Sequence, residues 1–128
     1  MDWSGETSAP DASADPVDLG RALAAMDGDR EILAEVVAVF LEECPGRLAA
    51  LTAAVERGSV VDAAEAAHAL KSALGAVGAH RAHDEAGELE HLARAGDVTG
   101  LRAAAGSFAA LVERALAFLT AQDLRHAR

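Results

Sequence analysis

The sequence has few aromatic residues, a single cysteine and no long apolar run, and each shortage excludes a class of protein. Aromatic residues make up 3% of the chain, which leaves little of the material that β-sheets favour. The single Cys44 excludes an internal disulfide and fits a reducing compartment. No run of about eighteen apolar residues is present, so the sequence predicts no transmembrane helix. The N-terminus, MDWSGETSAPDASADP, lacks the basic and then apolar order of a signal peptide. We therefore expect a cytoplasmic protein.

Basic residues are also scarce. The chain has 11 Lys and Arg against 21 Asp and Glu, which gives a formal charge of −10. Nucleic-acid binding needs clustered Lys and Arg to displace counterions from the phosphates, and anionic membrane surfaces favour the same clusters. No such cluster is found, so the charge favours another protein as the partner over nucleic acid or a membrane.

What the sequence has in quantity is alanine and other apolar residues at helical spacing. Residues 1–14 show no periodicity and are rich in Ser, Ala, Asp and Pro, so we expect a disordered leader there. Apolar positions then recur with the period of a helix in five segments, at about 16–26, 30–58, 59–77, 80–95 and 98–122. Asp15 before Pro16 is expected to cap the first of them.

The expected fold is all-α. Pro45 interrupts the second segment, but the apolar phase continues through it, so we predict one kinked helix that ends at Gly58. The connections are short, which makes consecutive helices antiparallel neighbours. Residues 15–125 should therefore form one domain, an antiparallel up-down four-helix bundle with a short additional N-terminal helix across one end.

His68 lies on the polar side of the third predicted helix. At about 100° per residue it is about 120° from the centre of the apolar face. Its sector of the helix holds short side chains, which are those of Val61, Ala64, Ser72 and Gly75. Glycine in a helix costs about 1 kcal/mol relative to alanine, so this pattern gives up stability and indicates an accessible imidazole. Lys71 lies beside it at i+3. A neutral imidazole is a competent nucleophile, although a solvated helix histidine with no function is the commoner case.

The spacing after this histidine resembles that of the histidine-containing phosphotransfer (HPt) domains of bacterial phosphorelays. In that family a lysine follows the histidine at +3, and small residues and glycines come next; the matching positions are His68, Lys71, Ser72, Gly75, Gly78 and Ala79. The likeness extends to the segments Leu89–Asp97 and Phe40–Leu51, and in all to about residues 16–122. Ser72 stands where many members have glycine, but serine is also small.

The resemblance implies a phosphorelay intermediate. His68 would accept a phosphoryl group from a receiver-domain aspartate and pass it to another receiver. The chain would then be a phosphocarrier without kinase activity or a cofactor of its own, with Mg²⁺ on the receiver. Glu90 matches the position from which members hold the unreactive imidazole nitrogen, and Lys71 would assist. The expected partners are receiver domains and a hybrid histidine kinase, and the expected docking face comprises Ala64, Ser72, Gly75 and Gly78 on a monomer.

Three other interpretations were weighed. A metal site among His80, His83, Asp84 and His91 is disfavoured, because His91 lies too far along the helix and no closed zinc spacing is present; a solvated face is expected there. The phosphoacceptor domain of a sensor kinase would need an acidic residue after the histidine and a following ATP-binding domain, whereas Ala69 follows His68. A helical protein–protein adaptor without phosphochemistry remains the alternative function.

Overall fold

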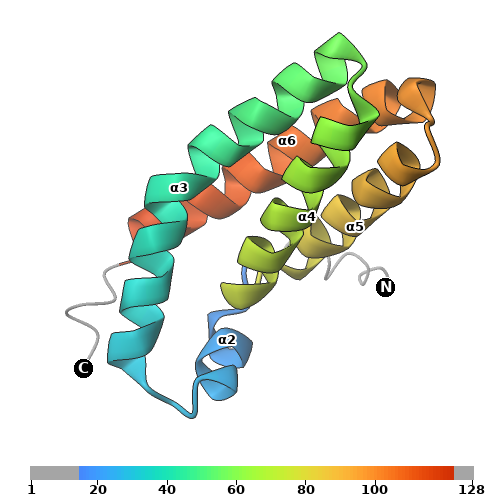
Figure 1. Cartoon of the computed structure of the whole chain (residues 1–128). Coiled ribbons are helices and arrows are strands. Elements are labelled where there is room, and N and C mark those ends of the chain that lie inside the picture. Colours follow the sequence, from blue (N-terminus) through green and yellow to red (C-terminus); the bar gives the residue numbers. More distant parts are fainter. Residues whose placement is uncertain (1–14, 123–128) are drawn as a thin grey trace, which may run out of the picture.

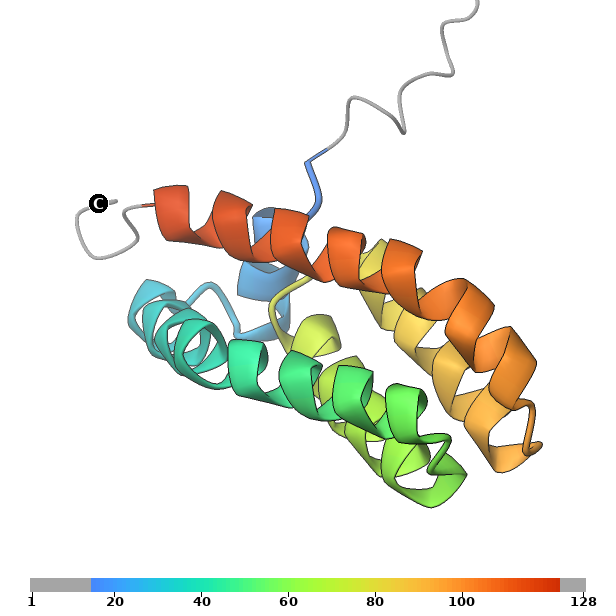
Figure 2. The same cartoon turned by 90° about the horizontal axis from the view of Figure 1, so that it is seen from above.

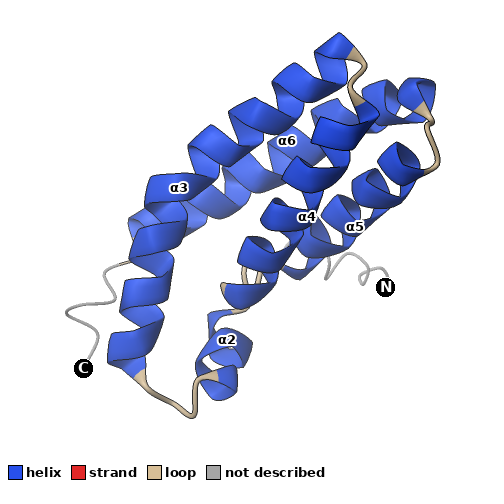
Figure 3. Ribbon diagram, in the orientation of Figure 1, coloured by secondary structure: helices blue, strands red, loops and turns tan. Residues whose placement is uncertain are grey.

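The computed structural model describes residues 15–122, and this part of the chain consists of helices and turns without strands (Figure 3). The helices are α2 (Leu19–Ala25), α3 (Arg30–Arg57), α4 (Val60–Ala76), α5 (His80–Arg94) and α6 (Val98–Ala121). The predicted bounds of the four long helices are therefore correct to within one or two residues. The predicted leader, residues 1–14, and the last residues of the predicted domain, 123–125, lie outside the described residues.

The four long helices share one core. Helix α4 packs against α3 and α5, and α6 packs against the same two helices from the other side (Figures 1 and 2). The short α2 lies at one end of this helical bundle and contacts α3. The elements that carry the residues of interest, α4 and α5, thus lie side by side.

Side-chain caps explain where three of the long helices begin. Asp29 accepts a hydrogen bond from Ile32 N over 3.1 Å, Ser59 accepts from Asp62 N over 3.4 Å, and Asp97 accepts from Gly100 N over 2.8 Å. Each cap satisfies a backbone N–H that has no partner within its own helix. In the sequence, each of these capping residues directly precedes a periodic apolar segment.

The predicted cap at Asp15 is wrong. Asp18 caps α2 instead and accepts from Arg21 N over 3.0 Å. The reason is a contact distant in sequence: Asp18 N donates to the carbonyl oxygen of Gly78 over 2.8 Å, and Val17 is buried. The residues from Asp15 to Asp18 are therefore held against the α4–α5 turn and do not join the helix.

Pro45 does not end α3. The helix is continuous from Arg30 to Arg57 and ends at Gly58, which is in the left-handed conformation. Its two halves run in different directions in Figure 1, with the change near the middle of the helix, where Pro45 lies. Proline removes one helical hydrogen bond and bends a helix toward the side that still has its bonds. The prediction of one kinked helix is confirmed.

The core is built from medium-sized and small side chains. The residues with the largest fully buried side chains include Phe108, Leu51, Leu70, Leu74, Leu89, Leu101 and Leu119. Where α4 meets α5, alanines dominate: Ala63, Ala67, Ala82, Ala86 and Ala93 are all buried. Small residues let two helix backbones approach closely, which places side chains of α5 within reach of the outer face of α4.

Helix α6 is long and apolar enough to cross a membrane by length and composition, the one such helix among the described residues. Core helices of soluble proteins meet the same criterion. In this structure Leu101, Phe108 and Val112 of α6 are buried against the other helices. Phe118, near the end of the same helix, is half-buried.

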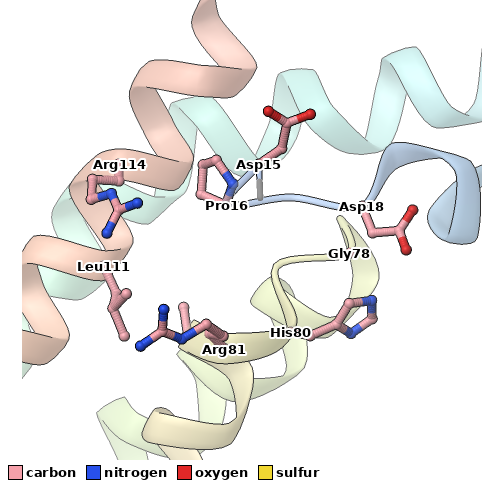
Figure 4. Close-up of a pocket in the computed structure, with 9 residues that line it drawn as sticks. Asp15, Pro16, Asp18, Gly78, His80, Arg81, Leu111 and Arg114 are labelled. Atoms are coloured by element: carbon pink, nitrogen blue, oxygen red, sulfur yellow. The ribbon is translucent and has the colours of Figure 1, made fainter. Parts of the chain in front are cut away.

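Figure 4 shows a hollow of about 250 Å³ where residues 15–18 meet α5 and α6. Pro16 and Leu111 form its apolar wall, and Arg81 and Arg114 reach into it from α5 and α6. His80, which also lines it, was expected on a solvated face but is half-buried, and its Nε2 has no hydrogen-bond partner in the described part of the chain. His68 is not among the residues that line this hollow.

Candidate functional site

His68 lies on the outward face of α4, with 59% of its side chain exposed. The neighbouring Ala67 and Leu70 are fully buried and fix the rotation of the helix about its axis. An outward position follows, because successive helical residues are about 100° apart. The accessibility that the sequence indicated is therefore observed.

One imidazole nitrogen of His68 is held by the next helix. Its Nδ1 lies 3.1 Å from Oε2 of Glu90 on α5. A carboxylate can only accept a hydrogen bond, so this contact requires the proton on Nδ1. The lone pair of the neutral ring is then on Nε2. The geometry thus leaves an exposed ring with a defined free nitrogen.

Glu90 also forms ion pairs with two cationic side chains. Lys71 Nζ lies 3.4 Å from Oε1, and Arg94 donates to Oε2 from NH2 over 2.7 Å and from Nε over 3.1 Å. The carboxylate is only 12% exposed. The hydrogen bonds from Arg94 lower the pKa of Glu90 below the usual value of 4.5; Lys71 and His68 act in the same direction, while burial opposes them. Glu90 is therefore ionised at neutral pH.

The sequence interpretation missed Arg94. Arg94 lies in the matched segment Leu89–Asp97, but the likeness gave it no role, and its i, i+4 spacing from Glu90 is typical of a helical ion pair. Such pairs are common on solvent-exposed helices, so the spacing alone does not indicate a site. The structure brings His68, Lys71 and Arg94 onto one carboxylate, and we call these four residues the Glu90 cluster.

The predicted docking residues differ in their surroundings. Ser72 is exposed one turn after His68, and Ala64 is buried with 7% exposure. Ala64 nevertheless lines a hollow of about 400 Å³ together with Val60, Val61 and Ala93, between α4 and α5. Val61 is 68% exposed, and the charged Glu65 and Arg94 line the same hollow, so the surface toward the start of α4 is partly apolar and partly charged.

Gly78 does not belong to the exposed face, contrary to the prediction. It is buried in the α4–α5 turn with φ +83°, and a Cβ there would collide with the backbone oxygen of Asp18. Glycine is needed at this position because an L side chain rarely adopts that backbone conformation. Its role in the described structure is to let residues 15–18 approach the turn.

Gly75 also has a role that the helical pattern did not predict. A Cβ at this position would lie 3.0 Å from Nδ1 of His83, so the imidazole of His83 occupies the space where a side chain would be. Gly75 itself is exposed, so at this position α5 limits the size of a side chain but does not close the sector predicted from α4. His83 itself was expected on a solvated face but is half-buried.

The described residues contain no group of three or more His, Cys, Asp or Glu side chains placed to hold a metal ion. His83 Nδ1 is engaged with the backbone oxygen of Lys71 over 2.8 Å. The groups that share the Glu90 carboxylate with His68 are two cations, Lys71 and Arg94, a pair suited to binding an anion beside an imidazole.

Comparison with known proteins identifies the family. A family model described as the Hpt domain matches residues 35–118. Neither the search of curated proteins nor the search of solved structures returned a match. The matched range runs from α3 to α6 and includes His68, Lys71 and Glu90. Because the match covers well over half of the sequence, the chain belongs to the Hpt domain family, whose members carry out histidine phosphotransfer in phosphorelays.

Proposed function

We propose that His68 is the phosphoacceptor of this Hpt domain and relays a phosphoryl group between receiver-domain aspartates. The observation that carries the proposal is the contact of Nδ1 with Glu90, which leaves Nε2 of an exposed ring free. An imidazole with one nitrogen held as N–H presents the other as the nucleophile.

Phosphoryl transfer to His68 forms one bond and breaks one bond. The Nε2 lone pair attacks the phosphorus of the aspartyl phosphate, and an N–P bond forms as the P–O bond to the aspartate breaks. The departing carboxylate keeps the electron pair of the broken bond. The ring then carries positive charge, which the carboxylate of Glu90 stabilises across Nδ1–H. The second transfer reverses these bond changes on another receiver.

Lys71 and Arg94 supply positive charge for the phosphoryl group. A phosphoryl group carries a charge of about −1.5 to −2 at neutral pH and offers strong acceptor oxygens. Both cations lie on Glu90 in the unphosphorylated chain, and both side chains are long enough to turn toward Nε2. Lys71 and Glu90 are therefore expected to tune the rate, while His68 carries the chemistry.

The wider setting follows from the same proposal. The chain acts as a monomeric cytoplasmic phosphocarrier between receiver domains and a hybrid histidine kinase, and the receiver supplies Mg²⁺ and most of the charge stabilisation. The helices α3 to α6 are proposed to alternate in direction, because only two or three residues join each pair of consecutive helices. The proposed docking face comprises Ser72, the exposed Gly75 and the hollow that includes Val61 and Ala64.

The test is label transfer from a panel of phosphorylated receivers to the wild-type chain and to His68→Gln. We expect label on the wild type alone, in a linkage labile to acid and stable to alkali, as a phosphoramidate is. Matched controls are His91→Gln and His80→Gln, which should be labelled like the wild type. Label that persists in His68→Gln would falsify the assignment. A wild type that no receiver labels would favour the adaptor.

A further inference from the structure

His83 makes a contact with the helix that carries His68. It lies near the start of α5, and its Nδ1 donates to the backbone carbonyl oxygen of Lys71 over 2.8 Å. In a helix that oxygen also accepts the hydrogen bond from the N–H four residues later, which belongs to Gly75. A carbonyl oxygen has two lone pairs, so both donors can be accommodated. The imidazole thus ties α5 to the peptide unit that carries Lys71.

Gly75 provides the space for this imidazole. A Cβ at position 75 would lie 3.0 Å from Nδ1 and 3.3 Å from Cε1 of His83, closer than ordinary van der Waals contact. Glycine is a poor helix former compared with alanine. The glycine therefore costs helix stability at a point where it allows a side chain of α5 to reach a carbonyl of α4.

Helix α5 holds Lys71 at three points along its length. His83 binds its carbonyl oxygen. The stem passes over Gly87, where a Cβ would lie 3.5 Å from Lys71 Cδ. The ammonium group lies 3.4 Å from Oε1 of Glu90. The backbone, the side-chain stem and the ammonium group of Lys71 are thus each contacted by a different residue of α5, and these three residues are about one helical turn apart.

We propose that His83 is a positioning residue for phosphotransfer. By holding the Lys71 peptide, it keeps the Lys71 ammonium in the Glu90 cluster and within reach of a phosphoryl group on His68. The inference rests on the proposed function of His68. His83 does not touch the phosphoryl group and acts through Lys71.

The competing explanation is purely structural. A half-buried histidine that satisfies its hydrogen bond can stabilise the contact between α4 and α5 and do nothing else. Its removal would then lower the free energy of unfolding, but it would leave the pairing of Lys71 with Glu90 and the transfer rate per folded molecule unchanged. The two explanations therefore differ in what happens at the Lys71 ammonium.

The first experiment needs no phosphotransfer. A double-mutant cycle with Lys71→Ala and Glu90→Gln, read by urea unfolding, measures the coupling between these two side chains. It is carried out in the wild-type chain, in His83→Leu, which has similar volume but no donor, and in His83→Asn, whose side-chain N–H can replace Nδ1–H. We expect the coupling to vanish in His83→Leu and to persist in His83→Asn. Equal coupling in all three backgrounds would overturn the proposal.

The second experiment follows label transfer at low and saturating receiver concentrations. His83→Leu should lower the maximal rate about two- to fivefold, the range expected for displacing an exposed cation from a nearby anion, and should leave the half-saturating receiver concentration unchanged. In a Lys71→Ala background, His83→Leu should not lower the maximal transfer rate any further. An equal slowing in that background would contradict action through Lys71. His91→Leu, at an exposed histidine of the same helix, is the control.

The design separates this inference from the function on which it rests. If the wild type takes no label, the proposed function fails, and the unfolding cycle alone decides whether His83 positions Lys71. If His83→Leu does not fold, Gly75→Ala takes its place, because it keeps the donor and displaces the ring. We expect Gly75→Ala to reproduce the loss of coupling; a full coupling in this variant would count against the proposal.

Discussion

At the scale of single residues, one carboxylate organises the site although a different residue carries the proposed chemistry. Glu90 contacts His68, Lys71 and Arg94, and its side chain is 12% exposed. Interactions at such a partly buried group are screened by salt less than those between exposed charges. One group therefore sets both the tautomer of the histidine ring and the position of two cations.

The ionisation of Glu90 makes part of the stability depend on pH. Because hydrogen bonds from Arg94, with help from Lys71 and His68, lower its pKa in the folded chain, the stabilisation is fully present above the unfolded value of 4.5 and is lost as the pH falls through the lower folded value. Urea unfolding should show Glu90→Gln to be less stable than the wild type at pH 6, with the difference shrinking at pH 3. Glu88→Gln, at an exposed position, is the control. A difference that stays constant with pH would mean that Glu90 stabilises through packing alone.

At the scale of elements, the turns position the site as much as the helices do. The α4–α5 turn fixes the offset of α5 along α4. This offset determines which side chains of α5 contact Lys71. Gly78 lets this turn accept Asp18 N at its carbonyl oxygen. A buried turn fixed by a neighbouring segment is a more rigid joint than a solvated loop.

Substitution of Gly78 should show how much this turn contributes. Gly78→Ala places a Cβ against the backbone oxygen of Asp18 and requires φ +83° of an L residue, so we expect a loss of more than about 1 kcal/mol in the free energy of unfolding. In Gly106→Ala, on α6, the added Cβ meets nothing within 4 Å. We expect this substitution to raise the free energy of unfolding by about 0.5–1 kcal/mol. Both are measured by urea unfolding. If Gly78→Ala and Gly106→Ala change the free energy of unfolding by similar amounts, residues 15–18 do not hold the turn in place.

At the scale of the whole molecule, local and distant interactions differ in how far the sequence predicts them. Helix ranges and the exposure of His68 follow from residues a few positions apart, so periodicity predicted them. Contacts between helices depend on rotation and offset, which no single helix encodes. The seating of His83 over Gly75 and the start of α2 at Leu19 were therefore missed, since each is set by a segment elsewhere in the chain.

The family resemblance predicted one contact between helices that periodicity could not predict. Glu90 was expected near His68 because it matched a family position, and the two side chains lie 3.1 Å apart. Arg94 also lies in a segment that matches the family, but the likeness assigned it no role, although it binds the same carboxylate more closely.

Cys44 offers a probe of whether the bundle opens as one unit. It is 1% exposed, and burial raises the pKa of its thiol to about 11, with Arg47 acting in the opposite direction. Alkylation requires an accessible thiolate. At pH 8 a thiol-specific reagent should therefore modify Cys44 only in molecules that have opened, and the rate reports the open fraction when reclosing is fast.

If opening is cooperative, a core substitution on another helix must raise this rate. Phe108 lies on α6, is fully buried and shares the core with α3. Truncation of a buried phenylalanine costs about 3–5 kcal/mol, so Phe108→Ala should speed the alkylation of Cys44 by about a hundredfold or more. The milder Val112→Ala should give a smaller rise, and Ala110→Ser, at an exposed position of α6, almost none. Mass spectrometry at intervals measures the rates, with circular dichroism to verify that each variant is folded. If Cys44 reacts equally fast in all of them, the part of α3 around Pro45 opens locally while α6 stays packed, and the four long helices do not unfold as a single unit.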